Sequence, residues 1–142
     1  IIWQKSKGAN ANFAWGSWLS ASNPVIRDIH EYCLVFSKDS MKNSSGGVST
    51  IEKDEFMEST LSIWNINPEK AKKIGHPAPF PVELPKRFIN LYSFKDDLVL
   101  DPFIGSGTTA IASKLMQRNY VGYEINKDYI EIANKRLETE TS

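Results

Sequence analysis

The pattern of apolar and polar positions is most regular towards the C-terminal end of the chain. Apolar residues recur there with helical spacing in three segments, and the two short apolar runs between them have the length of strands. The predicted elements are a helix at 84–94, a strand at 97–101, a helix at 108–118, a strand at 120–125 and a helix at 127–138 capped by Asn126. This alternation predicts an α/β fold in which helices cover a parallel sheet.

The first part of the chain is less regular. Residues 1–5 and 30–38 are predicted to be strands, and Tyr32, Leu34 and Phe36 alternate along the second of these. Because the other face of that segment is also partly apolar, we expect it inside a covered sheet.

A polar stretch follows at 39–50, and its serines and glycines indicate a linker or mobile loop. Ser49 and Glu52 have the spacing of a capping box, which predicts a short helix through Phe56 and Met57. Five prolines between 68 and 85 predict an irregular, extended path before the next helix.

Composition excludes several classes of protein. The 17 basic and 17 acidic residues cancel, so the chain has no overall basic field of the kind that binds nucleic acid. A single cysteine, Cys33, excludes an intrachain disulfide and a thiolate zinc cluster, and we expect no metal site and a reducing, cytoplasmic location. No apolar run approaches the roughly 20 residues of a membrane span, so we expect no membrane association.

The segment VLDPFIGSGTT, at 99–109, places a glycine turn between a strand and a helix. Gly105 and Gly107 allow close approach of a ligand to the backbone at the carboxyl end of a parallel strand. Glu124 ends the next strand, 23 residues after Asp101, where a carboxylate accepts hydrogen bonds from a ribose. Asp101 itself favours a cationic or amine-bearing ligand, and the two acids together fit a nucleoside with an amino-acid arm. The alternative is a tight strand-to-helix turn without a ligand.

Three segments resemble S-adenosylmethionine-dependent DNA amino-methyltransferases, in the permuted branch whose cofactor half is C-terminal. DPFIGSGTT followed by VGYEINKDYIEIANKRL is similar to the cofactor half of these enzymes. GHPAPFPVELPKRFI resembles the segment before it, and IIWQK with RDIHEYCLVFSK resembles the antiparallel strand pair at the sheet edge. The resemblance implies part of a doubly wound, mostly parallel Rossmann-like sheet with an antiparallel edge hairpin.

The resemblance also implies which residues bind S-adenosyl-L-methionine. Asp101 would lie near the amino-acid arm, Glu124 would hold the ribose and Ile125 would pack on the adenine. The implied set is His76, Pro77, Ala78, Phe80, Leu84, Asp101, Phe103, Gly105, Ser106, Gly107, Thr108, Glu124 and Ile125. We interpret His76 as structural or cofactor-lining rather than catalytic.

The tetrapeptide with which this family holds the target amino group is missing from the sequence. That motif reads Asp, Ser or Asn, then Pro-Pro, then an aromatic residue that stacks on the flipped base. Asp101-Pro102-Phe103 lacks the second proline, and neither Asn23-Pro24 nor Asn67-Pro68 is followed by a proline or an aromatic residue. We therefore expect no catalytic residue here, a C-terminal portion that is inactive alone, and a missing N-terminal part that acts as its partner.

The long loop between the first two strands is predicted to face double-stranded DNA. Its basic residues would neutralise phosphates, its amides would read base edges and its aromatic residues would stack on bases. The predicted contacts are Lys7, Asn10, Trp15, Ser17 and Arg27. In the alternative interpretation, the tryptophans only anchor the loop to the core.

These inferences divide the chain into three regions: an edge strand pair with a DNA-facing loop at 1–38, a segment similar to a target-recognition insertion at 39–75, and a cofactor region at 76–142. The predicted function is DNA amino-methylation in restriction–modification, with N4 of cytosine slightly favoured over N6 of adenine. Three alternatives remain at this point. They are a methyltransferase acting on RNA or a small molecule, a non-catalytic domain that binds nucleic acid or a partner, and a dinucleotide oxidoreductase, although Ala110 replaces its third glycine.

Overall fold

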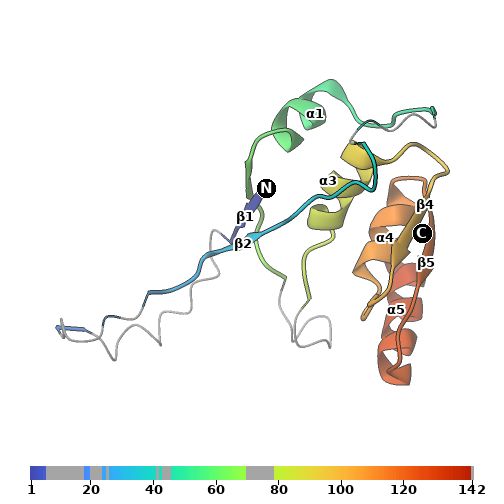
Figure 1. Cartoon of the computed structure of the whole chain (residues 1–142). Coiled ribbons are helices and arrows are strands. Elements are labelled where there is room, and N and C mark those ends of the chain that lie inside the picture. Colours follow the sequence, from blue (N-terminus) through green and yellow to red (C-terminus); the bar gives the residue numbers. More distant parts are fainter. Residues whose placement is uncertain are drawn as a thin grey trace. The chain divides into compact units, whose positions relative to one another are not determined.

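The computed structural model describes residues 1–5, 18–19, 24, 26–40, 42, 46–69 and 79–141 (Figure 1). The chain forms two compact units. The first consists of Ile1–Val35 and Leu61–Pro68, and the second of Phe36–Thr60 and Glu69–Ser142. The first unit is built on a small mixed sheet, and the second combines helices with a pair of parallel strands.

The sheet of the first unit has β1 (Ile2–Gln4) in the middle, between β2 (His30–Tyr32) and β3 (Ile63–Asn65). β1 and β2 are antiparallel, which confirms the predicted strand pair, whereas β1 and β3 are parallel. β2 is shorter than the predicted strand at 30–38, since its ladder with β1 ends at Tyr32. β3 is not predicted by the sequence pattern, because a three-residue strand is too short to show a period.

Two tryptophans on adjacent strands, together with Ile66, are buried in the core of the first unit. Trp3 of β1 lies directly opposite Trp64 of β3, and both side chains are buried. The indole N–H of Trp3 donates to the carbonyl oxygen of Ile66 at 2.8 Å, so the polar atom of this buried ring is satisfied.

The second unit contains β4 (Leu98–Asp101) and β5 (Asn119–Gly122), which pair in parallel and are joined by α4 (Thr108–Leu115). α3 (Glu83–Tyr92) packs against α4, and so does α5 (Lys127–Glu140), which follows β5. The predicted order of helices and strands is therefore confirmed, with small changes in the boundaries. α4 ends before residue 118 because Gln117 adopts a left-handed conformation, with φ of 61°.

Helix caps give one confirmed and one wrong prediction. The side chain of Asn126 accepts a hydrogen bond from the backbone N–H of Asp128 at 2.9 Å, as expected for the cap of α5. α1 (Lys53–Ser59) instead begins after Glu52 and has no side-chain cap, so the capping box with Ser49 is wrong. The segment before α1 is held by a backbone hydrogen bond instead of a capping box. The carbonyl oxygen of Val48 accepts from the backbone N–H of Lys95 at 2.9 Å.

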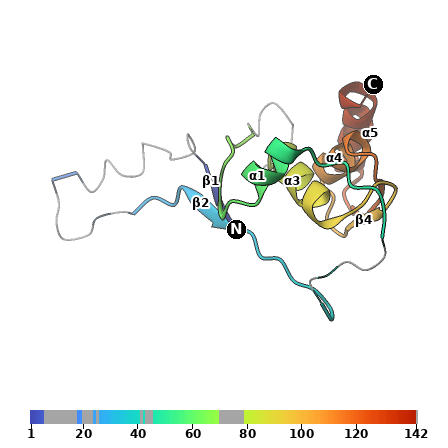
Figure 2. The same ribbon diagram turned by 90° about the horizontal axis from the view of Figure 1, so that it is seen from above.

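A polar network joins α1 to α3, which lie side by side in Figures 1 and 2. The guanidinium of Arg87 donates to Glu58 of α1 at 2.7 Å and to Glu83 of α3 at 2.9 Å. Asn90 of α3 donates to Glu55 of α1 at 2.8 Å. Burial lowers the pKa of Arg87, but the hydrogen bonds to its two carboxylate partners outweigh this and raise it above the ordinary value.

A second buried arginine joins α4 to the end of α3. Arg118 donates to the carbonyl oxygen of Ser93 at 2.6 Å, to the carbonyl oxygen of Met116 and to the hydroxyl of Thr50. Burial lowers the pKa of its guanidinium, and the charges of Asp97 and Asp96 act in the opposite direction. Arg118 is thus a structural residue that satisfies backbone carbonyls inside the unit.

Candidate functional site

The glycine turn lies between β4 and α4, at the carboxyl end of the strand pair. The backbone N–H of Gly107 donates to the carbonyl oxygen of Ile104 at 2.9 Å, which closes the turn. Gly105 and Gly107 have positive φ values of 51° and 84°, which favour glycine. A Cβ atom on Gly107 would lie 2.8 Å from the Cβ atom of Ala133 in α5, so this position also lacks room for a side chain.

Glu124 lies at this turn, as the sequence predicted. Its carboxylate accepts a hydrogen bond from the backbone N–H of Gly105 at 3.1 Å. The other carboxylate oxygen accepts from the backbone N–H of Asn126 at 2.8 Å. Glu124 therefore links the glycine turn to the residue that caps α5. Each carboxylate oxygen can accept a second hydrogen bond, so the side chain can still bind a hydroxyl group.

Asp101 ends β4 on the other side of the turn. Its carboxylate accepts from the backbone N–H of Phe103 at 2.9 Å, and this contact holds the start of the turn. The side chains of Phe103 and Ile125 follow the two strand ends, and both are almost fully exposed, at 87% and 101%. Two exposed apolar residues thus follow the two acids closely in the sequence.

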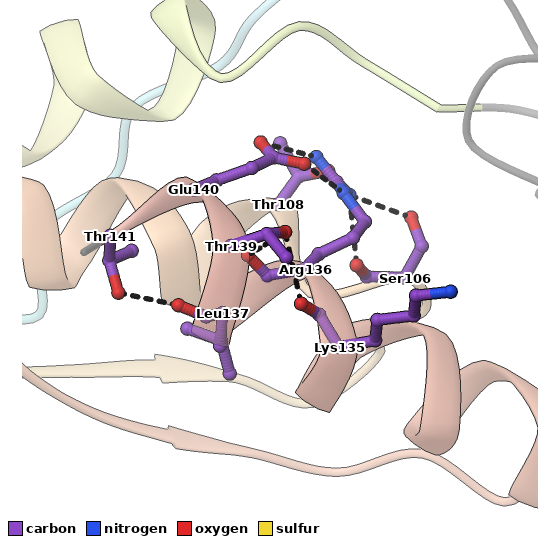
Figure 3. A network of polar contacts seen from close by, with 8 residues as sticks. All are labelled: Ser106, Thr108, Lys135, Arg136, Leu137, Thr139, Glu140 and Thr141. Carbon is purple, nitrogen blue, oxygen red and sulfur yellow. Dashed lines mark hydrogen bonds and ion pairs between the residues drawn. The ribbon is translucent and has the colours of Figure 1, made fainter.

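The first helical turn of α4 adds hydrogen-bond donors to the site. Backbone N–H groups in the first turn of a helix have no partner within the helix, and the partial charge there is positive. Ser106, just before this helical turn, and Thr108, its first residue, are both 4% exposed. Their side chains are held by Arg136 of α5, which the sequence pattern did not indicate (Figure 3). No short-range spacing could reveal it, because 28 and 30 residues separate the partners.

The other predicted cofactor residues lie before or within α3, or outside the described residues. Phe80 precedes α3 and is exposed, whereas Leu84 lies in its first turn and is half-buried. His76, Pro77 and Ala78 fall outside the described part of the chain.

Of the predicted DNA contacts, the structure describes only Arg27. It lies in the segment that leads to β2, and its side chain is exposed. Lys7, Asn10, Trp15 and Ser17 are outside the described residues.

The described residues contain neither a metal-binding cluster nor a membrane-spanning helix. Across the described ranges, no group of three or more His, Cys, Asp or Glu side chains could hold a metal ion. None of the helices described above is long and apolar enough to cross a membrane.

A glycine turn at the carboxyl ends of parallel strands, with an acid just after the second strand, is typical of the class of α/β proteins that bind nucleotide-like ligands. The model of the N6_N4_Mtase family, described as DNA methylase, matches residues 1–135. The chain therefore belongs to this family of DNA methylases.

Individual relatives agree with this assignment. The type II methyltransferase M.BglI of Bacillus subtilis is 43% identical over 146 residues, which cover 97% of this chain and 38% of the relative. M.MthZI of Methanothermobacter thermautotrophicus is 31% identical over 150 residues, covering 96% of this chain and 42% of the relative. The chain thus spans less than half the length of these curated relatives.

Solved structures show the same fold. TTHA0409 of Thermus thermophilus, described as a DNA modification methylase, has a TM-score of 0.70 and 28% identity, covering 99% of this chain and 55% of that one. The complex of TTHA0409 with S-adenosyl-L-methionine has a TM-score of 0.67 and 27% identity, covering 99% and 52%. These matches confirm the expected Rossmann-like α/β methyltransferase fold.

Proposed function

We propose that this chain forms the cofactor-binding part of a DNA methyltransferase that uses S-adenosyl-L-methionine. The observation that carries the proposal is the contact between Glu124 and the backbone N–H of Gly105, which joins the predicted ribose-binding acid to the glycine turn. TTHA0409, a neighbour of the same fold, has been solved with S-adenosyl-L-methionine, which supports the choice of ligand.

The residues present fit this cofactor. Glu124 would accept hydrogen bonds from the ribose hydroxyls, and Asp101 would lie near the ammonium of the amino-acid arm. The exposed side chain of Ile125 would cover the adenine, and Phe103 would line the same site. Bound there, the cofactor supplies an electrophilic methyl group, while the residues of this chain bind and orient it.

The rest of the cofactor site is proposed to come from the segment before α3. Phe80 and Leu84 would close over the methionine end, together with His76, Pro77 and Ala78. Gly105, Ser106, Gly107 and Thr108 would form the floor of the site, where the backbone allows close approach.

The group that receives the methyl is proposed to be an exocyclic amine of a DNA base. Overall likeness of the sequence favours N4 of cytosine slightly over N6 of adenine. The named relatives M.BglI and M.MthZI are type II methyltransferases, which supports a role in restriction–modification. Arg27, with Lys7, Asn10, Trp15 and Ser17, would contact the double-stranded DNA.

We propose that cofactor binding and catalysis are carried by different parts of the enzyme. The tetrapeptide that holds the target amine is absent from these 142 residues, and the matched relatives are more than twice as long. The catalytic residues would therefore lie in the remaining part of the enzyme, in the same polypeptide or in a separate subunit, and this chain would be inactive alone.

Nucleoside analysis of methylated DNA tests this function. The complete protein is incubated with DNA and S-adenosyl-L-methionine, and the methylated nucleosides of that DNA are identified by mass spectrometry. The expected product is N4-methylcytosine, and none is expected from residues 1–142 alone. N6-methyladenine would correct the target base. Absence of both products from the complete protein, although it binds DNA, would favour the alternative of a non-catalytic nucleic-acid-binding domain.

A further inference from the structure

Arg136 reaches from α5 to the glycine turn and binds it at three points (Figure 3). Its Nη1 atom donates to the carbonyl oxygen of Ser106 at 2.9 Å and to the hydroxyl oxygen of the same residue at 3.2 Å. The hydroxyl oxygen of Thr108 is a third acceptor at 3.1 Å. Since Nη1 carries two hydrogens, the three oxygens share them. One side-chain nitrogen therefore fixes two of the residues that lead into α4.

The other edge of the guanidinium is occupied by Glu140, one helical turn further along α5. Arg136 Nε donates to Glu140 Oε1 at 2.9 Å, and Nη2 lies 3.4 Å from Oε2. The Arg136 side chain is 11% exposed and that of Glu140 is 38% exposed. A charge so far from water is costly unless it is paired, and Glu140 provides this pairing. The ion pair holds the guanidinium in the orientation that it needs to reach the turn.

α5 contacts the same turn at a second point. Ala133 lies three residues before Arg136, on the same face of the helix, and it fills the space beside Gly107. The hydroxyls of Ser106 and Thr108 are thus held by Arg136, and Gly107 is confined by Ala133. Glu124 binds the turn from the other end, through the N–H of Gly105.

We propose that Arg136 is a positioning residue for the cofactor site. It holds the Ser106 carbonyl and the two hydroxyls towards α5, and so fixes the orientation of the peptide groups that face the ligand. The inference rests on the proposed function, because the ligand is the methyl donor assigned to this turn. In this network the guanidinium of Arg136 contacts only the turn and Glu140, and it acts on the cofactor through them.

The test compares four forms of the complete protein: wild type, Arg136→Met, Arg136→Lys and Lys135→Met. Methionine keeps the apolar stem of Arg136 and removes every donor, whereas lysine keeps a charged donor. Lys135 is the matched control, because its exposed side chain takes no part in the network drawn in Figure 3. Two quantities are measured: the affinity for S-adenosylhomocysteine by calorimetry, and hydrogen exchange without ligand of the Gly105 and Gly107 amides, which are hydrogen-bonded within the turn region.

Arg136→Met is expected to weaken S-adenosylhomocysteine binding about tenfold or more and to speed exchange of the turn amides to a similar degree. Arg136→Lys is expected to recover part of both losses, because an ammonium can donate to the turn oxygens but cannot also keep the two-point pairing of the guanidinium with Glu140. Lys135→Met should match wild type. If Arg136→Met does not fold, Thr108→Val provides the second test, with a smaller loss of affinity expected because it removes only one acceptor.

Wild-type affinity and wild-type exchange in Arg136→Met would overturn the proposal, as would an Arg136→Lys variant no better than Arg136→Met. The exchange measurement distinguishes failure of the positioning role of Arg136 from failure of the proposed cofactor assignment. If wild type itself does not bind S-adenosylhomocysteine, the cofactor assignment fails, and exchange in the ligand-free turn still reports whether Arg136 holds it. A Thr108→Val variant with unchanged affinity would also count against the inference.

Discussion

Gly107 shows how one residue combines two constraints. Its φ of 84° disfavours any side chain, and a Cβ atom would meet Ala133 at 2.8 Å. Gly46 is a matched control, since its φ is 73° but a Cβ atom there would have nothing within 4 Å. We expect Gly46→Ala to cost about 1 kcal/mol of unfolding free energy from the backbone alone. Gly107→Ala should cost about 2–4 kcal/mol, because the clash adds to the strain. Urea unfolding measures both variants, and equal costs would contradict the role of Ala133.

The positions of Glu124 and Asp101 at the glycine turn could be predicted from the sequence, and the contact of Arg136 with this turn could not. Asp101 ends β4, and Glu124 comes shortly after the end of β5. The ends of both strands are fixed by local pattern, so the position of these acids at one edge follows from the topology of a parallel sheet. The contact of Arg136 with the turn depends on which face of α5 is directed towards the turn, and on how the side chains between them pack. Neither property is encoded in a short spacing, and an arginine near the end of a helix is usually an exposed, solvated residue.

At the scale of elements, Arg118 joins the ends of α3 and α4 to the segment before α1. Replacing it with methionine would leave the partly buried carbonyl oxygens of Ser93 and Met116 without this donor, so we expect a loss of about 2–4 kcal/mol of unfolding free energy. Lys114→Met is the control, because Lys114 is an exposed cation on α4. Urea unfolding of both variants checks this. A loss no larger than that of the control would show that water can replace these contacts.

The elements that were predicted correctly are those with a long, regular pattern. α3, α4 and α5 repeat their apolar positions over at least two turns, and Asn126 adds a specific cap to α5. β3 has three residues, and its pairing with β1 depends on partners 61 positions apart in the chain. The capping box failed for a related reason, because the segment through Val48 and Thr50 is held by α3 and its C-terminal loop rather than by α1.

At the scale of the whole molecule, one face of β4 is apolar and exposed. Leu98 and Leu100 are 65% and 61% exposed, whereas Val99, on the opposite face of the strand, is half-buried. Parallel sheets are normally covered on both faces. We therefore expect other parts of the complete enzyme to cover these leucines.

Substituting Leu100 tests this expectation in the complete protein. Leu100→Asp should lower the melting temperature by several degrees, because it would bury a carboxylate in an apolar contact. Val48→Asp is the control, since Val48 is 66% exposed but lies outside the sheet. Equal, small shifts for the two variants would show that the face of β4 remains in water.

The most direct test of the account is calorimetric titration of S-adenosylhomocysteine into the complete protein and its Glu124→Ala and Glu131→Ala variants. Glu131 is an exposed acid on α5 and serves as the matched control. We predict one site per chain, a loss on the order of 1.5–3 kcal/mol of binding free energy for Glu124→Ala, and none for Glu131→Ala. Glu124 also contacts Gly105 and Asn126, so its substitution can lower stability. Thermal unfolding of the variants without ligand measures this loss of stability separately from the loss of affinity. Absence of binding by wild type, or unchanged affinity in Glu124→Ala, would contradict the assignment of the glycine turn as the cofactor site.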